Sequence, residues 1–366
     1  MSDTEAAAPV PRSVRTRVLK RAPVSGPVSA SGLMPGRVAG PMRLALDTGA
    51  PKMCSAAAGP AVPVVLLHGQ PGSPLEWQAV VPLLREDRRV IVPTRPGYAG
   101  DPGEATNWAG NATALLDLLD DTGIERALIV GFSWAGGAAI EAAIRAPARV
   151  AGLVLVSSVG DRRAVNWVDS LLANAMLVRI FAPLLGRYAP MLAGFAARGA
   201  GSRLRPQGVA MLRAAMFEMG RNHGWMAAAV EQRALLRDAD SLAGRLGRVS
   251  VPTVVVAGRR DTNVPFKASR GLAAAIPGAR LWALKKAGHL LPLEAPEQIA
   301  AAVRVAATAS TVGTASTAST ASTASTASTA STASTASTAS AASAASAASA
   351  AGTVGTVGTA DTPDAG

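Results

Sequence analysis

The sequence predicts an α/β protein in which helices flank a mostly parallel central sheet. Between about residues 62 and 307, short runs typical of β-strands alternate with longer runs typical of helices, as expected for strands joined by crossover helices. Each strand-like run is almost continuously apolar, which indicates burial on both faces of the sheet. With 366 residues, 49% of them hydrophobic, the chain is long enough to bury a core of ordinary domain size.

Six segments carry the strand prediction. Each is bounded by turn-forming residues and is shorter than a typical buried helix. In chain order they are VPVVLLH (62–68), RRVIVPT (88–94), RALIVGF (126–132), VAGLVLVSS (150–158), PTVVVAG (252–258) and ARLWALK (279–285).

Helices are predicted in the gaps between these strands. The helical segments cover residues 76–86, 111–123, 136–147 and 296–307. Residues 160–246 interrupt the alternation with Leu-, Met- and Ala-rich sequence that is typical of helices. We interpret residues 160–246 as a helical cap, or lid, inserted above the carboxyl edge of a core that comprises residues 41–159 and 247–306.

Both ends of the chain are predicted to be disordered. Residues 1–40 form an Arg-, Pro- and Ala-rich leader without periodicity, and residues 307–366 form a low-complexity tail of Thr, Ala and Ser. Side chains this small bury too little surface to offset the entropy lost on ordering. Neither end is expected to carry the chemistry.

The charge balance suggests nucleic-acid binding as one interpretation. The net charge is +12, from 36 basic and 24 acidic residues. However, the basic residues are scattered, their densest group (residues 12–21) lies in the leader, and no recognised nucleic-acid module accompanies them. We therefore predict no nucleic-acid partner.

Cellular setting and cofactors follow from a few residue types. Cys54 is the only cysteine, so no intrachain disulfide forms, and the N-terminus lacks the apolar segment of a secretory signal; both favour the cytoplasm. Arg179 and Pro183 are among the residues that interrupt the longest apolar stretch, so no stable membrane insertion is predicted. Three histidines in unrelated segments argue against a metal site, and we predict no cofactor. The oligomeric state is not indicated.

The segment VGFSWAGGAA (130–139) places Ser133 between a predicted strand and a predicted helix. A serine that attacks an acyl carbon needs a base, a carboxylate that orients the base, and donors for the developing oxyanion. A tight strand–turn–helix lifts the serine oxygen clear of the sheet, and small residues at 131, 135 and 136 allow the close approach that this turn requires. We interpret Ser133 as a nucleophile; the alternative is a turn serine without chemistry.

Four segments resemble motifs of the α/β-hydrolase family, specifically its serine-nucleophile, esterase- and lipase-like members with a helical lid. The resemblance covers about residues 62–305, and the order Ser, Asp, His is also that of the family. The segments are LLHGQPGSPLEW (66–77), similar to the oxyanion loop; GFSWAGG (131–137), similar to the nucleophile elbow; GRRDTNVP (258–265), similar to the acid turn; and AGHLLPLEAPE (287–297), similar to the histidine loop.

The resemblance implies a role for particular residues. Ser133 would be the nucleophile, His289 the general base and Asp261 the orienting carboxylate. The backbone N–H groups of Gln70 and Trp134 would form the oxyanion hole. The sequence departs from the family at Ala135, Thr94 and Ala99, where glycine, aspartate and glycine are respectively more usual.

Two assignments remain open in the sequence. Asp261 is the predicted acid, but a G-x-x-D turn is also common without chemistry, and Asp161 is then the substitute. A substrate pocket is predicted among residues of the oxyanion loop and the lid, and ordinary packing is the alternative for each of them. The predicted pocket residues are His68, Trp77, Trp167, Trp225 and Met226.

These residues predict a serine hydrolase that cleaves a small, largely apolar ester, thioester, lactone or amide through an acyl-enzyme. The partner is then a small-molecule substrate. A carbon–carbon bond hydrolase and a cofactor-free perhydrolase or haloperoxidase use the same three residues and remain alternatives. The competing class is a non-catalytic protein that binds a small molecule in the same fold, because the fold does not decide function.

Overall fold

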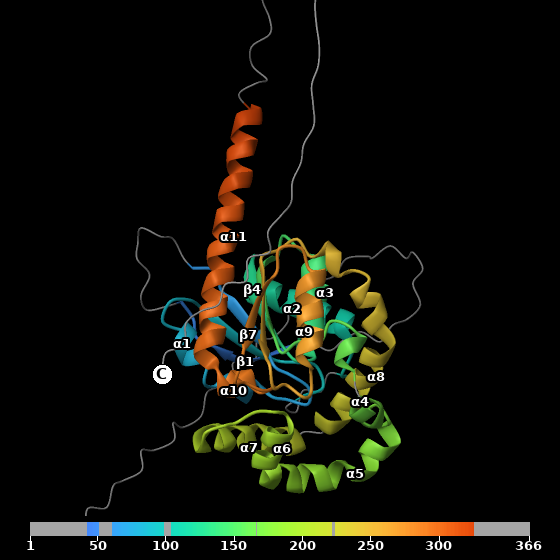
Figure 1. The fold of residues 1–366 in the computed structure, drawn as a ribbon. Coiled ribbons are helices and arrows are strands. Elements are labelled where there is room, and N and C mark those ends of the chain that lie inside the picture. The colour runs from blue at the N-terminus through green and yellow to red at the C-terminus, as the bar shows by residue number, and fades with distance from the viewer. Residues whose placement is uncertain (1–41, 51–60, 99–103, 166, 222–223, 326–366) are drawn as a thin grey trace, which may run out of the picture. The chain divides into compact units, whose positions relative to one another are not determined.

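The computed structural model describes residues 42–50, 61–98, 104–165, 167–221 and 224–325, and they confirm the predicted fold class. A seven-stranded sheet forms the centre, and helices cover both of its faces (Figure 1). The strands are β1 (Arg43–Asp47), β2 (Val64–Leu67), β3 (Val90–Thr94), β4 (Ala127–Phe132), β5 (Val150–Val156), β6 (Thr253–Gly258) and β7 (Arg280–Leu284). Their order across the sheet is β1-β3-β2-β4-β5-β6-β7.

The six predicted strands are β2 to β7, and they pair in parallel. The edge strand β1 was not predicted, and it runs antiparallel to β3. Its five residues are exposed or only partly buried, so they lack the continuous apolar character that marks the other strands. Pairing with β3, rather than local sequence, makes this segment a strand.

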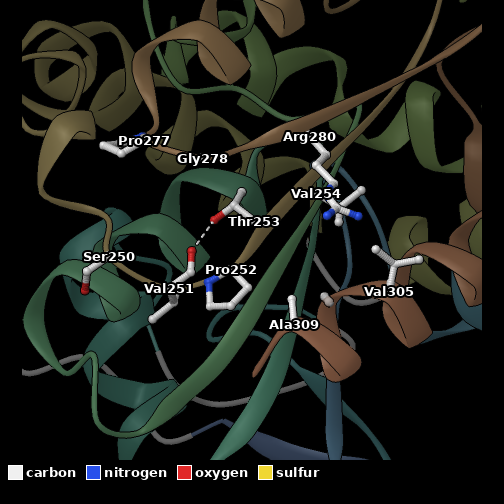
Figure 2. Close-up of a pocket in the computed structure, with 11 residues that line it drawn as sticks. Ser250, Val251, Pro252, Thr253, Val254, Pro277, Gly278, Arg280, Val305 and Ala309 are labelled. Carbon is white, nitrogen blue, oxygen red and sulfur yellow. Dashed lines mark hydrogen bonds between the residues drawn. The ribbon is translucent and has the colours of Figure 1, made fainter. Parts of the chain in front are cut away.

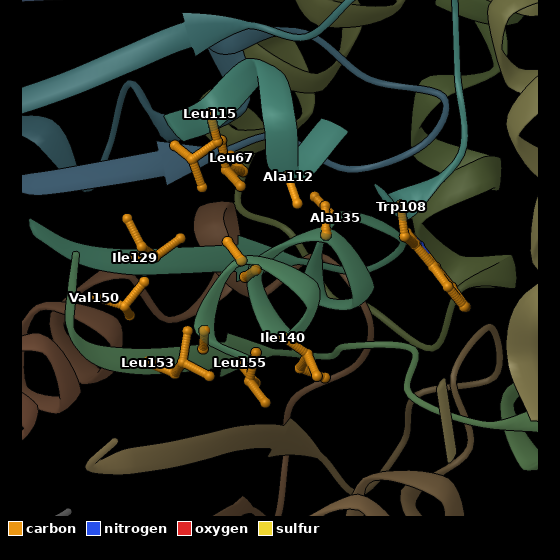
Figure 3. Close-up of a cluster of buried hydrophobic side chains, with 14 of the residues drawn as sticks. Leu67, Trp108, Ala112, Leu115, Ile129, Ala135, Ile140, Val150, Leu153 and Leu155 are labelled. Carbon is orange, nitrogen blue, oxygen red and sulfur yellow. The ribbon is translucent and has the colours of Figure 1, made fainter. Parts of the chain in front are cut away.

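Successive side chains of each central strand point to opposite faces of the sheet and enter two separate cores. On one face Leu67, Ile129 and Leu155 pack beneath helical residues such as Leu115 and Ala135 (Figure 3). The helices on this face are α2 (Trp108–Asp121), α3 (Ala135–Arg145) and α9 (Phe266–Ala275). α2 and α3 were predicted, whereas α9 was not.

The opposite face is covered by helices from both ends of the described chain. Val64, Leu66 and Leu128 share a buried cluster with residues of these helices. The elements are η1 (Pro74–Trp77), α1 (Val81–Leu84), α10 (Leu291–Glu294) and α11 (Pro296–Ser325). The single helix predicted at 76–86 is instead η1 followed by α1, because Pro82 has no backbone N–H with which to continue a helix.

The chain between β5 and β6 is helical, as predicted. It contains η2 (Arg162–Ala164), α4 (Trp167–Leu172), α5 (Ala175–Tyr188), η3 (Ala189–Leu192), α6 (Ala193–Gly199), α7 (Pro206–Arg221), α8 (Gly224–Ala243) and η4 (Leu246–Arg248). We call residues 167–243 the helical insertion. Figure 1 shows α5, α6 and α7 together beyond one edge of the sheet. A function of the insertion as a lid stays a prediction.

The C-terminal helix α11 continues to Ser325, although a tail without regular structure was predicted from residue 307. Its first turns pack on the sheet through Ile299 and Val303, which provides a nucleus from which alanine-rich sequence can extend as helix. Contacts divide the chain into two compact units, residues 1–317 and 318–366, and the candidate site lies within the first. The predicted leader, Cys54 and the rest of the tail lie outside the described residues.

Candidate active site

Ser133 stands on the turn between β4 and α3. Its backbone is left-handed, with φ at 53°, a conformation that costs a non-glycine residue about 1–3 kcal/mol. A Cβ atom on Gly131 would lie 2.7 Å from the Cα of Gly136, and one on Gly136 would lie 2.3 Å from the Cβ of Ser158. Strand and helix therefore pass too close for larger residues at these positions. Ala135, where the family usually has glycine, fits fully buried at the start of α3.

The structure brings Ser133, His289 and Asp261 together, although they lie far apart in sequence. Ser133 Oγ is 3.1 Å from His289 Nε2, and His289 Nδ1 is 2.9 Å from Asp261 Oδ2. An ionised carboxylate only accepts hydrogen bonds, so Nδ1 carries the imidazole proton and Nε2 accepts from the serine hydroxyl. All three residues are buried, with exposed fractions between 5% and 7%. This arrangement can take a proton from the serine as its oxygen attacks.

Backbone hydrogen bonds hold the acid and the imidazole in place after β6 and β7. Asp261 Oδ1 accepts from the amides of Asn263 and Val264 at 2.9 and 2.8 Å, which leaves Oδ2 for His289. His289 donates its own backbone N–H to the carbonyl oxygen of Ala200 at 3.0 Å. Because β4, β6 and β7 run in parallel, the loops at their carboxyl ends meet at one edge of the sheet.

Asp161, the alternative acid, is bound within its own turn. Its Oδ1 accepts from the backbone amide of Arg163 at 2.7 Å, and its Oδ2 lies 3.2 Å from the Nε of the same arginine. The carboxylate that His289 contacts is that of Asp261. The geometry therefore favours Asp261 over Asp161 as the partner of the imidazole.

The loop after β2 runs directly beside the serine. A Cβ atom on Gly69 would lie 3.4 Å from the Cβ of Ser133. The peptide bond between Gln70 and Pro71 is cis. Within the described residues, no hydrogen-bond partner is found for the backbone amides of Gln70 and Trp134. Available N–H groups beside a buried serine are what an oxyanion hole requires, and this role stays a prediction.

Glu76 is a buried carboxyl group that sequence reasoning missed. Its Oε2 accepts from the backbone amide of Gly69 at 2.9 Å, and its side chain lines the same cavity as Ser133. Burial raises the pKa of Glu76 to about 7, against the opposing effects of the Gly69 hydrogen bond and the charge of Arg95. The only signal in the sequence was one carboxylate within the segment LLHGQPGSPLEW. This group can change charge near neutral pH beside the oxyanion loop.

A buried ion pair joins the residue after β3 to helix α8, and sequence reasoning missed this pair as well. Arg95 and Glu231 are both fully buried, and the guanidinium group binds the carboxylate. Tyr98 also donates to Glu231, at 2.7 Å. Arg95 donates in addition to the carbonyl oxygens of His68 at 2.9 Å and of Gly69 at 2.7 Å. Arg95 therefore fixes the backbone of the loop to the helical insertion.

Helix α8 also binds both residues that are expected to supply the oxyanion amides. Gln70 Nε2 donates to the carbonyl oxygen of Ala228 at 2.6 Å. The indole Nε1 of Trp134 donates to the carbonyl oxygen of Glu231 at 3.2 Å. These partners are 158 and 97 positions apart in the chain, so no local pattern could reveal them.

A cavity of about 130 Å³ opens beside Ser133 and His289. Four residues of α7 give it an apolar wall, and the oxyanion loop faces that wall. The lining residues are Gln70, Pro71, Gly72, Glu76, Phe132, Ser133, Leu212, Ala215, Met216, Met219, Asn263 and His289. The cavity is therefore a small, partly apolar space with the serine hydroxyl at its surface.

His68 does not line this cavity, in contrast to the prediction. Its Nε2 accepts from the backbone amide of Arg95 at 3.1 Å, so its Nδ1 carries the proton and donates to the carbonyl oxygen of Gly69 at 3.0 Å. Burial, aided by the charge of Arg95, holds the pKa of His68 well below its usual value. His68 is therefore a neutral support of the loop, the alternative role considered for it from the sequence.

The predicted pocket residues Trp77, Trp225 and Met226 also do not line the cavity. Trp77 is fully buried and packs edge-on against Phe132, with ring centroids 6.3 Å apart. Trp225 and Met226 lie in the first turn of α8, whereas α7 supplies the wall of the cavity. The side chain of Trp167 lies outside the described part of the chain. Composition identified the insertion as apolar, but only packing decided which helix faces the serine.

Within the part of the chain that the structure describes, neither a second hollow at the start of β6 nor a metal cluster competes with this site. A hollow of about 300 Å³ lies around the start of β6 (Figure 2), whereas Asp261 follows the other end of that strand. Thr253 in this hollow already donates to the carbonyl oxygen of Val251 at 2.9 Å, and Arg280 is the only charged residue that lines it. No histidine or carboxylate among its lining residues could activate Ser250. Among the described residues, no three His, Cys, Asp or Glu side chains are grouped to hold a metal ion.

Comparison with known proteins assigns the chain to one family. A model of the Alpha/beta hydrolase family matches residues 64–302. The 2-hydroxymuconate semialdehyde hydrolase of Pseudomonas sp. (strain CF600) is 30% identical over 262 residues, which cover 67% of this chain and 86% of that protein. A solved structure of a thermophilic esterase from Thermogutta terrifontis superposes with a TM-score of 0.55 at 28% identity, and covers 72% of this chain and 92% of the esterase.

A further relative shares only part of its length with this chain. The dihydrolipoyllysine-residue acetyltransferase component of the acetoin cleaving system of Pseudomonas putida is 31% identical over 255 residues. The match covers 65% of this chain but only 61% of that protein. The similarity therefore concerns one portion of a longer protein.

Proposed function

The chain belongs to the alpha/beta hydrolase family and is a hydrolase, and from this premise we propose its reaction. The chain cleaves a small, largely apolar ester, thioester, lactone or amide through an acyl-enzyme on Ser133. The observation that carries this proposal is the hydrogen-bonded series from Ser133 to His289 and from His289 to Asp261. This series borders the cavity of about 130 Å³.

The acylation step uses the geometry around Ser133. His289 Nε2, 3.1 Å from Ser133 Oγ, takes the hydroxyl proton while Oγ bonds to the carbonyl carbon of the substrate. Asp261 holds the imidazole in the required tautomer and stabilises the imidazolium that forms. The amides of Gln70 and Trp134 donate to the oxyanion, and their fixed positions avoid reorganisation during the reaction.

The leaving group and water complete the cycle. The imidazolium of His289 gives its proton to the departing alcohol, thiol or amine as the bond to the acyl carbon breaks. A water molecule then loses a proton to His289 and attacks the acyl carbon of the ester on Ser133, which forms a second tetrahedral intermediate. This intermediate collapses and releases the acid, and Ser133 Oγ takes the proton back from His289. The same three residues thus serve both halves of the reaction.

The size and lining of the cavity support a small substrate with an apolar part. Met216, Met219 and Leu212 form one wall, and methionine side chains adapt to different apolar shapes. None of the polar residues that line the cavity belongs to α7; they are Gln70, Glu76, Ser133, Asn263 and His289. We infer that the scissile bond lies at this polar end and that the apolar part of the substrate lies against α7.

Hydrolysis of a carbon–carbon bond is the second candidate. The 2-hydroxymuconate semialdehyde hydrolase of Pseudomonas sp. is 30% identical over 262 residues, which supports this candidate. The same nucleophile, base and acid are available for it. The substrate named for that relative is therefore a suitable second probe.

A series of p-nitrophenyl esters of increasing chain length tests the proposal. We expect the purified chain to hydrolyse short and medium esters, and Ser133→Ala to lower kcat/KM by at least about 10⁴-fold, as for removal of a serine nucleophile elsewhere. A fluorophosphonate probe should label the wild type and not the variant. Equal hydrolysis by the wild type and by Ser133→Ala would exclude the mechanism. A binding protein would be favoured if the probe does not label the wild type and the wild type hydrolyses neither an ester nor 2-hydroxymuconate semialdehyde.

The two candidate acids offer a matched pair of substitutions. Asp261→Asn should lower kcat by about 10⁴-fold, because the asparagine favours the wrong tautomer of His289. Asp161→Asn removes a carboxylate bound only to its own turn, so kcat should change by less than about threefold. Steady-state kinetics on one ester compare the two variants, and a larger loss in Asp161→Asn would reverse the assignment.

A further inference from the structure

Large apolar side chains are exposed almost only on the helical insertion. Eleven large apolar side chains of the described residues are exposed, and ten of them lie between residues 171 and 217. Met176, Met191 and Phe195 are the most exposed, at 74%, 70% and 68%. An extended apolar surface of this kind usually marks a site of interaction.

This surface is one side of a continuous helical segment. Residues 175–199 have a mean hydropathy of 1.3 over their most apolar window, yet only 17% of that window is buried. Val178, Ala193 and Ala197 are buried and attach the segment to the rest of the insertion. Figure 1 shows α5 farther from the sheet than α7. We call the exposed side the outer face; its residues are Met176, Ile180, Phe181, Leu184, Tyr188, Met191, Leu192 and Phe195.

The outer face is also strongly basic. From residue 170 to residue 217 the sequence contains six arginines and no aspartate or glutamate. All six arginines are exposed; Arg179, Arg187 and Arg198 lie within the segment 175–199 that carries the outer face, and Arg203, Arg205 and Arg213 follow it. The guanidinium carbon of Arg198 lies 4.8 Å from the centroid of the Phe195 ring, so cationic and apolar groups adjoin each other.

We propose that the outer face binds the surface of an anionic phospholipid bilayer. Helices with exposed Phe, Leu and Met and with arginines at their flanks lie in the interfacial plane, where apolar side chains enter the acyl boundary and guanidinium groups bind phosphates. Arg179 and Arg187 interrupt the apolar segment and its buried side packs on the protein, so it lies flat and does not cross the bilayer.

The charge of the outer face argues against the other occupants. A second copy of the chain would bring Arg179, Arg187 and Arg198 against the same three residues, and residues 170–217 contain no aspartate or glutamate to pair with them. An acidic protein would match the arginines, but it would supply no hydrocarbon for the eight exposed apolar side chains of the outer face. The boundary of an anionic bilayer supplies both kinds of partner at once.

Helix α7 connects this surface to the candidate active site. Leu212 and Met216 line the cavity beside Ser133, whereas Arg213 and Phe217 on the same helix are exposed. Because α5 lies farther from the sheet than α7 (Figure 1), both helices separate a bilayer on the outer face from the cavity. This inference concerns where the protein acts, and it stands independently of the bond that Ser133 is proposed to cleave.

Co-sedimentation with lipid vesicles tests the inference on the full chain. We expect the chain to bind vesicles of equal parts phosphatidylcholine and phosphatidylglycerol at least about tenfold more tightly than vesicles of phosphatidylcholine alone. The difference should shrink as salt is added, because exposed charges are screened. Failure of the wild type to bind the mixed vesicles would overturn the proposal.

Two triple variants with the same change of net charge separate the outer face from general basicity. Arg179→Gln/Arg187→Gln/Arg198→Gln should weaken binding to the mixed vesicles by about 100-fold. Lys267→Gln/Arg270→Gln/Lys285→Gln removes three exposed charges that lie outside the helical insertion. This variant should change binding by less than about threefold. Equal losses in both variants would show that only the total charge matters, which contradicts a docking face.

A third variant tests the apolar contribution and the other occupants. Phe181→Ser/Leu184→Ser should weaken vesicle binding by at least about tenfold. If sedimentation equilibrium instead shows a wild-type dimer that this variant dissociates, a second copy covers the face. If poly-L-glutamate binds the wild type and this variant equally tightly, and as tightly as the vesicles do, the face is a site for acidic protein. None of these residues lines the cavity, so hydrolysis of a soluble ester should be unchanged in every variant.

Discussion

The central sheet and the helical insertion use apolar residues in opposite ways. In β2, β4 and β5 every residue is buried, and their side chains fill two cores against helices. In α5 only Val178 is buried, although the helix is as rich in large apolar residues. The hydrophobicity of a segment therefore does not show whether its apolar side chains are buried or exposed in this protein. The position of the segment relative to the sheet determines their burial.

The insertion is nevertheless attached to the core by polar contacts. Glu231 in α8 is fully buried, and it binds Arg95 and Tyr98. The insertion thus has an inner helix that holds the oxyanion loop and outer helices that leave apolar side chains exposed. A buried ion pair, in addition to apolar packing, therefore connects the two regions.

The largest expected effect comes from breaking that connection. Arg95→Met leaves the Glu231 carboxylate buried without its partner, and we expect a loss of about 3–5 kcal/mol in the free energy of unfolding. Urea denaturation measures the loss. The double variant Arg95→Met/Glu231→Leu removes the unpaired charge and should lose less than the sum of the two single variants. Additive losses would mean that the ion pair does not couple the regions.

The second effect is a dependence of stability on pH, and it comes from Glu76, which binds the same oxyanion loop from the side of the sheet domain. The pKa of Glu76 is raised to about 7 by burial, so its contribution to stability is full below the unfolded pKa of about 4.5 and is lost as pH rises through about 7. Relative to Glu76→Gln, the free energy of unfolding of the wild type should therefore fall by about 2.5 kcal/mol between about pH 5 and about pH 8. Denaturation curves at both pH values measure this difference, and an unchanged difference would refute the shifted pKa.

The smallest effect is expected on the outer face. Leu184 is 52% exposed, so Leu184→Ala should change the free energy of unfolding by less than about 0.5 kcal/mol. The matched core substitution Leu115→Ala removes a fully buried side chain from α2 and should cost about 2–5 kcal/mol. Thermal or urea unfolding compares the two. A loss in Leu184→Ala as large as in Leu115→Ala would show that the outer face is packed in solution.

Much of the fold and part of the site could be predicted from sequence. The parallel strands were predicted because burial on both faces produces continuous apolar runs, and the nucleophile turn because it needs small residues around Ser133. β1 could not be predicted, because its pairing with β3 and not its composition makes it a strand. The cavity wall could not be predicted either, because α7 and α8 are similar in composition and only their packing differs.

Local sequence alone was enough to predict the six parallel strands and the candidates for nucleophile, base and acid, because short-range apolar patterns and turn chemistry are local properties. Only the tertiary structure decided that Asp261 rather than Asp161 contacts His289, that Glu76 lines the cavity and that Arg95 joins the oxyanion loop to Glu231. Each of these depends on contact and burial between segments far apart in the chain. Burial sets the pKa of a group such as Glu76, and burial is a property of the folded molecule alone.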